Sequence, residues 1–260
     1  MIGLSDFGPR ADEVVEHERD GLREEAGTVA ALHGRRLVLA CRAAATAALF
    51  LDYGPEAFRA RLADAAAARA YVLAHVAPDA DGVERFFKVT EPGFVDALAC
   101  QDWAVARQIG AVDLPWRPDS EYEEDHLFHA FLADVVVRRD HERAASRLSE
   151  IVRAREGAPW TRLRVGRAVL DADSEAFDDA FRRLLDDWEA EVEFWRTSLG
   201  RDDVAFMTDE RVFIEGLAIL QVARALGIEI RDAYRFCPEE VLALPPPTEP
   251  STLFTAASSA

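Results

Sequence analysis

The chain has 260 residues, of which 50% are hydrophobic and 30% are charged, and its formal net charge is −18 at pH 7. This composition suits a globular protein with a substantial core, and the negative charge argues against nucleic-acid binding, because phosphate neutralisation needs a basic face. No apolar run reaches the ~18–20 residues of a membrane span, and residues 1–20 lack the pattern of a secretory signal, so we expect a cytoplasmic protein with no membrane segment.

The N-terminal half of the sequence predicts helices separated by glycine, proline and polar loops. Gly54-Pro55 ends one helix and begins the next, because glycine can terminate a helix and proline suits a first turn. Asp119-Ser120 precedes a run of acidic residues and suits the start of another helix. The expected helices cover residues 11–26, 28–53, 55–76, about 92–109 and about 120–139.

The longest helical pattern lies in the second half of the chain. Apolar residues recur at steps of three and four from residue 174 to residue 199, which predicts one helix with a continuous apolar seam. The seam consists of Phe177, Phe181, Leu184, Trp188, Val192, Trp195 and Leu199. Two shorter helices, at about 141–155 and 159–170, are expected before it.

The sequence from residue 208 to residue 226 predicts a helix that is apolar on nearly every side, so other helices must surround it. Thr208 suits an N-cap, and Gly227 suits a left-handed residue after the helix. Glu215 points about 140° away from the only polar stripe, towards the dry side. This position favours a structural carboxylate paired with an arginine and leaves a functional acid as the alternative. The polar stripe consists of Glu210, Gln221 and Arg224.

No segment alternates with the period of two that strands show, so the fold is predicted to be all-α. We expect a single domain of eight or nine antiparallel helices around the buried helix at 208–226, covering residues 1–244. Residues 245–260 contain a proline cluster followed by Ser, Thr and Ala, which predicts a disordered tail.

The sequence contains no motif that specifies a reaction or a cofactor. His126 and His129, three residues apart on one predicted helix and preceded by Glu123, are candidate metal ligands, but the Glu-x-x-His element of di-iron bundles needs a second copy on another helix. No glycine-rich loop matches a nucleotide fingerprint, and no serine has a nucleophile elbow. Cys41, Cys100 and Cys237 form no close pair, which indicates reduced thiols. We therefore expect no metal, no cofactor and no enzymatic activity.

Negative charge is concentrated in residues 171–215, which contain 15 acidic and 5 basic residues. Such a region is a solvated surface or a docking face for a basic protein. A docking face also needs aromatic anchors, because a few desolvated side chains carry most of the binding energy of an interface. The candidate partner-binding residues are Trp116, Tyr122, Asp186, Asp187, Glu189, Glu193, Asp202 and Asp203.

The C-terminal third resembles the end of members of the bacterial immunity protein 49 family. A tryptophan-containing acidic helix is followed by FIEGLAILQVARALGIEIRDAYRFCPEEVL, and upstream FVDALACQDWAVARQIGAVDLP is similar to an Ala/Arg-rich helix of that family. The matching positions are Gly227, Ile228, Ile230, Tyr234, Pro238 and Val241-Leu242. The resemblance covers roughly residues 90–244, and the chain departs from the pattern at Phe236-Cys237. The PoNi family of DNase-effector immunity proteins has a comparable ending, with a glutamate inside the helix as at Glu215.

These resemblances imply a cytoplasmic protein without enzymatic activity that binds one cognate toxin domain and blocks its active site. Many such toxins are nucleases with basic clefts, which a carboxylate-rich surface complements. The identity of the toxin and the oligomeric state do not follow from the sequence.

Two other classes of function are open at this point. A helical hydrolase or metal oxidase would use a polar pocket around Glu215 and His126, with Glu123 as a further candidate. A helical scaffold for protein interactions would form a regular superhelix with a long concave groove. A toxin gene beside the gene of this chain would favour immunity, whereas a metabolic operon would favour an enzyme.

Overall fold

The computed structural model describes residues 7–51, 54–77, 86–197, 204–230 and 233–254. In these ranges the chain forms helices and loops, and the extended backbone pairs only at an isolated bridge between Tyr234 and Cys237. The all-α class is therefore confirmed. Among the described helices, none combines the length and the apolar character that a membrane crossing requires.

The described residues form helices from one end of the chain to the other. The first part of the chain contains the 3₁₀ turn η1 (Gly8–Arg10), α2 (Ala11–Glu24), α3 (Gly27–Phe50), α4 (Pro55–His75), α5 (Phe94–Ala99), α6 (Trp103–Gly110) and α7 (Glu123–Ala133). The second part contains the π-helical turn η3 (Asp134–Arg138), α8 (His141–Ala154), α9 (Thr161–Asp171), α10 (Ser174–Arg196), α11 (Val204–Asp209), α12 (Ile214–Ala225) and α13 (Glu239–Leu242).

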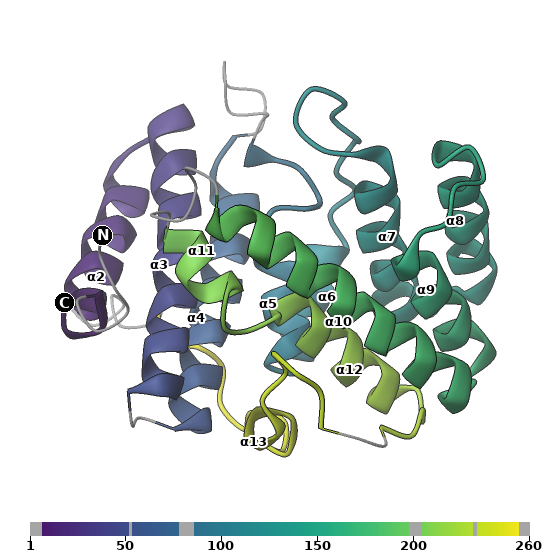
Figure 1. The fold of residues 1–260 in the computed structure, drawn as a ribbon. Helices are drawn as coiled ribbons and strands as arrows, with labels where there is room; N and C mark the ends of the chain where they lie inside the picture. Colours follow the sequence, from purple (N-terminus) through teal and green to yellow (C-terminus); the bar gives the residue numbers. More distant parts are fainter. Residues whose placement is uncertain (1–6, 52–53, 78–85, 198–203, 231–232, 255–260) are drawn as a thin grey trace.

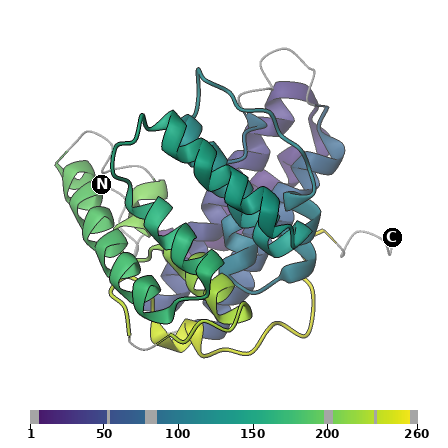
Figure 2. The same ribbon diagram turned by 90° about the vertical axis from the view of Figure 1, so that its right-hand side faces the viewer.

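The helices form two end groups with a middle group between them (Figure 1). Helices α2, α3 and α4 pack together at one end, and α7, α8 and α9 lie at the other. The long helix α10 crosses the front of the molecule, and α12 packs on α5 in the middle. In the view turned by 90°, α7 to α9 face the reader and α10 lies along the left edge (Figure 2). In this middle group, α5 and α6 contact α4 at one end, whereas α6 contacts α7 and α10 contacts α9 at the other.

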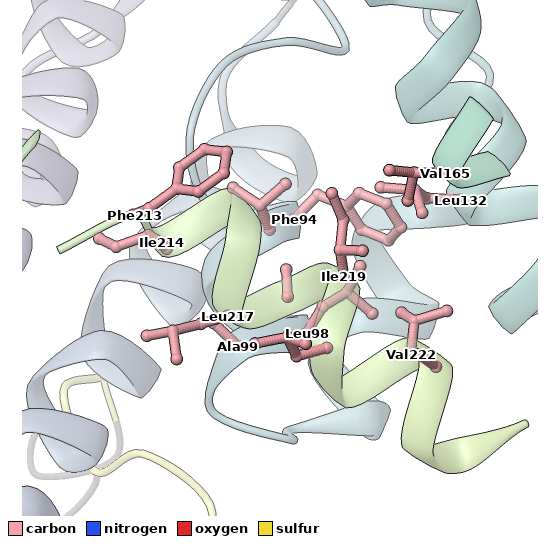
Figure 3. Close-up of a cluster of buried hydrophobic side chains, with 14 of the residues drawn as sticks. Phe94, Leu98, Ala99, Leu132, Val165, Phe213, Ile214, Leu217, Ile219 and Val222 are labelled. Atoms are coloured by element: carbon pink, nitrogen blue, oxygen red, sulfur yellow. The ribbon is translucent and has the colours of Figure 1, made fainter. Parts of the chain in front are cut away.

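The helix α12 is the buried helix of the fold. Leu217 and Ile219 of α12 lie among Phe94 and Leu98 of α5, and Leu132 of α7 closes the cluster on another side (Figure 3). The larger of two clusters of buried side chains is built around this contact, and the smaller one joins α2, α3 and α4. The prediction of a nearly all-apolar helix at the centre is confirmed for α12.

The predicted helix at 208–226 is divided into α11 and α12 by a turn at residues 210–213. Phe213 donates its backbone N–H to the carbonyl of Phe236 at 2.8 Å, so a tertiary hydrogen bond replaces a helical one. The prediction that Thr208 caps the buried helix is wrong, because Thr208 lies buried within α11. The run of apolar residues predicts one continuous helix. In the structure, the carbonyl of Phe236 in the C-terminal segment accepts the hydrogen bond of the Phe213 N–H and so interrupts the helix.

In the predicted polar stripe, Gln221 is buried and Arg224, although exposed, contacts the C-terminal segment. Gln221 is only 3% exposed, and the guanidinium of Arg224 donates a hydrogen bond to the carbonyl of Leu242 in α13. Gly227 follows α12 with a φ of 82°, which confirms the left-handed residue expected at this end.

The seam of α10 is confirmed from Phe177 to Val192, with Trp188 partly buried and the others fully buried. Trp195 differs, since 46% of it is exposed. Leu199 lies outside the described residues, and the helix is described only to Arg196. The apolar residues of the seam therefore recur beyond Val192, the last described one that is buried in the core.

Two other predicted helices differ from the structure. The helix at 92–109 is divided into α5 and α6 at Gln101, whose φ of 61° lies outside the helical region. The helix expected from Asp119-Ser120 begins only at Glu123, and its last turn widens into η3. Because of these divisions, the described ranges hold more helices than the eight or nine predicted.

Residues 245–254 differ from the predicted disorder. Phe254 stacks on Tyr71 of α4 with ring centroids 4.3 Å apart, and Ser251 donates a hydrogen bond to Asp64 at 2.6 Å. The composition is polar and proline-rich, but the Phe254 ring and hydrogen bonds with Arg23 of α2 and with Arg59 and Asp64 of α4 dock this segment. Residues 255–260 lie outside the described residues.

We expect Phe181→Ala to lower the free energy of unfolding by about 3–5 kcal/mol, because its ring is fully buried. That ring lies between Phe177, at 5.6 Å, and Tyr234, at 4.8 Å. The matched control is Phe194→Ala on the same helix, which is 65% exposed and should cost less than about 0.5 kcal/mol. Urea denaturation measures both, and equal losses would contradict the described orientation of α10.

Candidate functional site

A polar cavity of about 370 Å³ lies where α10 and the start of α12 meet the middle of the molecule. Residues from seven helices and three connecting segments contribute, so no single stretch of sequence forms the cavity. Its walls are formed by Arg42, Thr90, Pro92, Val95, Ser120, Glu121, Tyr122, Asp125, His129, Arg162, Trp188, Glu191, Asp209, Phe213, Ile214 and Glu215. Five of these residues carry a carboxylate and two carry a guanidinium group, so the walls are predominantly acidic.

Helix geometry places the central charged groups of the cavity. Asp125 and His129 are four residues apart on α7 and therefore share one face. Arg162 is the second residue of α9, and Glu215 is the second residue of α12. A carboxylate suits the positive end of a helix dipole, whereas an arginine does not. Pairing the two helix starts through these side chains compensates the unfavourable position of Arg162.

Arg162 and Glu215 form a bidentate ion pair. Arg162 Nε donates to Glu215 Oε1 at 2.6 Å, and its Nη2 donates to Oε2 at 3.0 Å. Burial acts to raise the pKa of Glu215, but the Arg162 guanidinium outweighs it, so this pKa lies below its ordinary value of 4.5. The guanidinium also lies 5.7 Å from the ring of Trp160. The sequence-based expectation of a carboxylate paired with an arginine is therefore confirmed.

His129 presents a hydrogen-bond acceptor to the cavity. Its Nδ1 lies 3.1 Å from the backbone carbonyl of Val89, which can only accept, so Nδ1 carries the proton. Burial lowers the pKa of His129 below its ordinary value of 6.5, and the charge of Glu215 opposes this only in part. The neutral ring therefore has a free lone pair on Nε2, on the side away from Val89. Nε2 has no hydrogen-bond partner among the described residues.

Two carboxylates of the cavity make no ion pair or hydrogen bond within the described part of the chain. Asp125 lies on α7 beside Glu215, and burial raises the pKa of Asp125 above its ordinary value of 3.8, although Arg162 partly offsets this. Glu191 lies on α10 and is exposed. Both are close enough to Arg162 to act on its charge, yet neither contacts it directly. They are therefore available to a cationic group that enters the cavity.

The loop before α7 positions the two aromatic residues predicted to bind a partner. Glu121 accepts hydrogen bonds from the hydroxyl of Thr90 at 2.8 Å and from the backbone N–H of Arg117 at 3.2 Å. Trp116 donates its indole N–H to the carbonyl of Glu121 at 3.2 Å. Trp116 is 42% exposed and Tyr122 is 75% exposed. Both rings are thus presented on an internally bonded loop, and Tyr122 lies in the cavity wall.

The predicted acidic residues of α10 lie on two different flanks. At about 100° per residue, Asp187 shares a flank with Glu191 of the cavity, whereas Asp186, Glu189 and Glu193 lie on the other side of the helix. The sequence-based prediction of one acidic face on this helix therefore needs correction. Only Asp187 of this set lies on the cavity side.

Arginines already pair with the acidic residues on the far flank. Arg235 contacts Asp186 at 2.9 Å and Glu189 at 2.6 Å, and Arg196 contacts Glu193 at 2.5 Å. Their negative charge is therefore partly neutralised within the chain. The remaining two predicted residues, Asp202 and Asp203, lie outside the described residues.

The residues of the metal-enzyme alternative are not assembled in one place. His126 Nδ1 lies 3.2 Å from Glu121 Oε1, Glu215 is held by Arg162, and Glu123 is exposed at the start of α7. Among the described residues, no group of three or more His, Cys, Asp or Glu side chains has a geometry that could hold a metal ion.

The sequence did not predict that Asp125, His129, Arg162 and Glu191 line one cavity, and it suggested His129 only as a metal ligand beside His126. The Asp-x-x-x-His spacing of the first two predicts a shared helix face, and Glu191 borders the apolar seam three residues after Trp188. These signals were present in the sequence, but they do not specify that α7 and α10 face the same cavity. Arg162 carried no signal, since its basic segment contains many arginines.

Comparison of the chain with known protein families, with curated proteins and with solved structures finds no match.

We expect Glu215→Ala to lower the free energy of unfolding by about 3 kcal/mol, because it leaves the Arg162 guanidinium mostly buried and unpaired. Replacing both partners, as Glu215→Leu with Arg162→Met, should recover most of the loss, since no charge remains buried. The exposed pair supplies the control: Glu193→Ala should cost less than about 1 kcal/mol. A double variant no more stable than Glu215→Ala would contradict this account. Urea denaturation of the wild type and of the three variants gives these free energies.

The same pair predicts a pH dependence. In the unfolded chain Glu215 binds its proton near the ordinary value of 4.5, and in the folded chain it does so only at lower pH. Just below pH 4.5 the unfolded state therefore binds more protons, and the stabilisation by this carboxylate is lost as pH falls. The difference in unfolding free energy between the wild type and Glu215→Gln should be constant from pH 7 to about 5 and shrink below pH 4.5. If this difference in unfolding free energy grew as the pH fell, the prediction of a lowered pKa for Glu215 would be refuted.

Proposed function

We propose that the chain is an immunity protein of the cytoplasm that binds one cognate toxin domain and blocks its active site. The observation that carries this proposal is a group of exposed aromatic side chains on two of the segments that line an acidic cavity. The group consists of Trp116, Tyr122, Phe194 and Trp195. Exposed aromatic side chains beside a polar recess are typical of surfaces that bind a protein partner.

The aromatic pair on α10 lies close to the cavity. Phe194 and Trp195 follow Glu191 by three and four residues, which is roughly 4.5–6 Å along the helix. Their ring centroids are 5.6 Å apart in an edge-to-face arrangement, and both rings are largely exposed. Rings of this kind add large apolar area to an interface at a small cost in side-chain entropy. They would act as anchors around a charged centre.

The charge of the chain supports a basic partner. A net charge of −18 attracts a basic protein over long distances and raises the rate of association. The active sites of nucleases are basic because they bind phosphate, and an acidic surface can occupy such a site in place of the substrate. The resemblance to the immunity protein 49 family, and to the PoNi family, supports the same class of partner.

The direct test is co-expression of this chain with the toxin domain encoded beside its gene. Growth restored by the wild type, together with a stable complex of the two purified proteins, would support immunity. Growth inhibition that the chain does not relieve, with no complex at micromolar concentrations, would refute it. Replacing the toxin domain by a catalytically inactive variant keeps the binding measurement possible when the active toxin cannot be produced.

Electrostatic steering predicts which carboxylates set the on-rate. Reversing Asp187 and Glu191 to lysine should slow association with the toxin domain by about tenfold or more at low salt, because both lie on the cavity flank of α10. The matched control reverses Glu189 and Glu193, which changes the net charge equally but on the flank already paired with arginines. Stopped-flow kinetics at several salt concentrations measures both. Equal slowing by the two variants would show that only net charge matters.

A further inference from the structure

We propose that the cavity lined by Asp125, Glu191 and Glu215 binds the guanidinium group of an arginine side chain from the partner protein. This inference rests on the proposed function for the partner, and it adds which chemical group of that partner the cavity recognises. Three independent features of the cavity support it: its charge, an acceptor with no partner, and an aromatic wall.

The first feature is an excess of negative charge that the chain itself does not neutralise. The two guanidinium groups in the cavity wall already have partners, because Arg162 is held by Glu215 and Arg42 by Asp96, at 2.6 Å. Asp125 and Glu191 have no ion pair or hydrogen bond within the described part of the chain. A cation that enters the cavity therefore meets two available carboxylates and displaces no existing ion pair.

The second feature is the free nitrogen of His129. This residue is only 8% exposed and lines the cavity, and its Nε2 lone pair lies on the side of the ring away from Val89. The charges of Glu215, Asp125 and Arg162 all act on it. This acceptor has no donor within the described part of the chain, and the N–H of a ligand in the cavity would supply one. Among cationic groups, a guanidinium can donate to His129 and to carboxylates at the same time, because it has five N–H groups in a rigid plane.

The third feature is the aromatic wall formed by Trp188 and Phe213. Their rings stack with centroids 4.4 Å apart and planes inclined by 18°, and both residues line the cavity. An arginine side chain has an apolar stem and a planar cationic head, so it can lie along such a wall while its head reaches the carboxylates. An ammonium group is compact and strongly hydrated, so a lysine matches this combination less well.

The size and setting of the cavity favour a side chain of a protein over a free small molecule. A volume of about 370 Å³ is near the lower end of ligand pockets, which span about 300–1,000 Å³. Tyr122, at the cavity, is 75% exposed, and with Phe194 and Trp195 it offers apolar area beyond the cavity that a free small cation would leave uncovered. A partner protein would use both the cavity and these rings.

The test compares two blocked tripeptides, acetyl-Gly-Arg-Gly-amide and its citrulline analogue, which has the same shape but no charge. Binding to the full chain is measured by NMR titration, with the side-chain ¹⁵Nε2 resonance of His129 as the reporter. We expect the arginine peptide to bind about tenfold more tightly than the citrulline peptide and to shift that resonance. A lysine peptide should bind more weakly than the arginine peptide.

Matched variants locate the site. Glu191→Gln and Asp125→Asn should each weaken binding of the arginine peptide by about fivefold or more, because each removes one charged acceptor. Glu193→Gln, on the far flank of the same helix, should leave binding unchanged. Circular dichroism confirms that each variant is folded. Equal binding of the arginine and citrulline peptides, or arginine binding that ignores both cavity variants, would overturn the inference.

The outcomes separate this inference from the proposed function. If the chain neutralises the toxin but the cavity does not distinguish arginine from citrulline, the arginine site is wrong and immunity stands. If the cavity binds the arginine peptide as expected but no toxin is neutralised, immunity is wrong and the chain recognises arginine in another partner. Mutating each surface arginine of the toxin domain to glutamine then identifies the side chain that the cavity accepts.

Discussion

The burial of α12 on nearly every side is the constraint on which the rest of the structure depends. A helix with almost no polar face cannot lie at a surface, so α5 packs directly against it and α7 and α9 contribute to the same cluster. Its first turn nevertheless carries Glu215, at the edge of this apolar environment. A carboxylate there is tolerated because Arg162 reaches it from the start of α9 with two hydrogen bonds. The packing of α9 against the start of α12 thus supplies the charge that neutralises Glu215.

The polar cavity is a consequence of the same arrangement. The turn at residues 210–213 lets α12 begin beside α10 rather than continue from α11, and this turn is held by the hydrogen bond from Phe213 to Phe236. At this junction the apolar seam of α10 reaches its last buried positions, and the charged groups of α7, α9 and α12 meet. A recess with both stacked aromatic rings and free carboxylates forms because the core ends here, not because one motif specifies it.

The distribution of charge on α10 separates a stabilising role from a binding role. The carboxylates on the far flank are engaged by Arg235 and Arg196, and such exposed pairs contribute little to stability. Glu191 and Asp187 on the cavity flank are different, since they add negative charge to a region that already contains Asp125. The net charge of the whole chain favours an encounter with a basic partner, whereas the cavity flank sets where that partner would dock.

The sequence by itself determined the helical class, the buried character of α12 and the orientation of most of α10. These properties follow from local periodicity, because a helix that repeats apolar residues at steps of three and four must bury that face. The pairing of Glu215 with an arginine also followed from sequence, since a carboxylate on a dry face needs a counter-charge. Which arginine it is depends on how α9 packs against α12, and periodicity contains no information about that contact.

Only the tertiary structure decided where helices break and which charged groups share a cavity. The break before α12 depends on a carbonyl of Phe236, more than twenty residues later in the chain. Likewise, His129 has a free Nε2 only because Val89, on a distant loop, occupies its Nδ1. Such contacts join residues that are far apart in sequence, so their energies have no local signature, and a reading of the chain segment by segment cannot recover them.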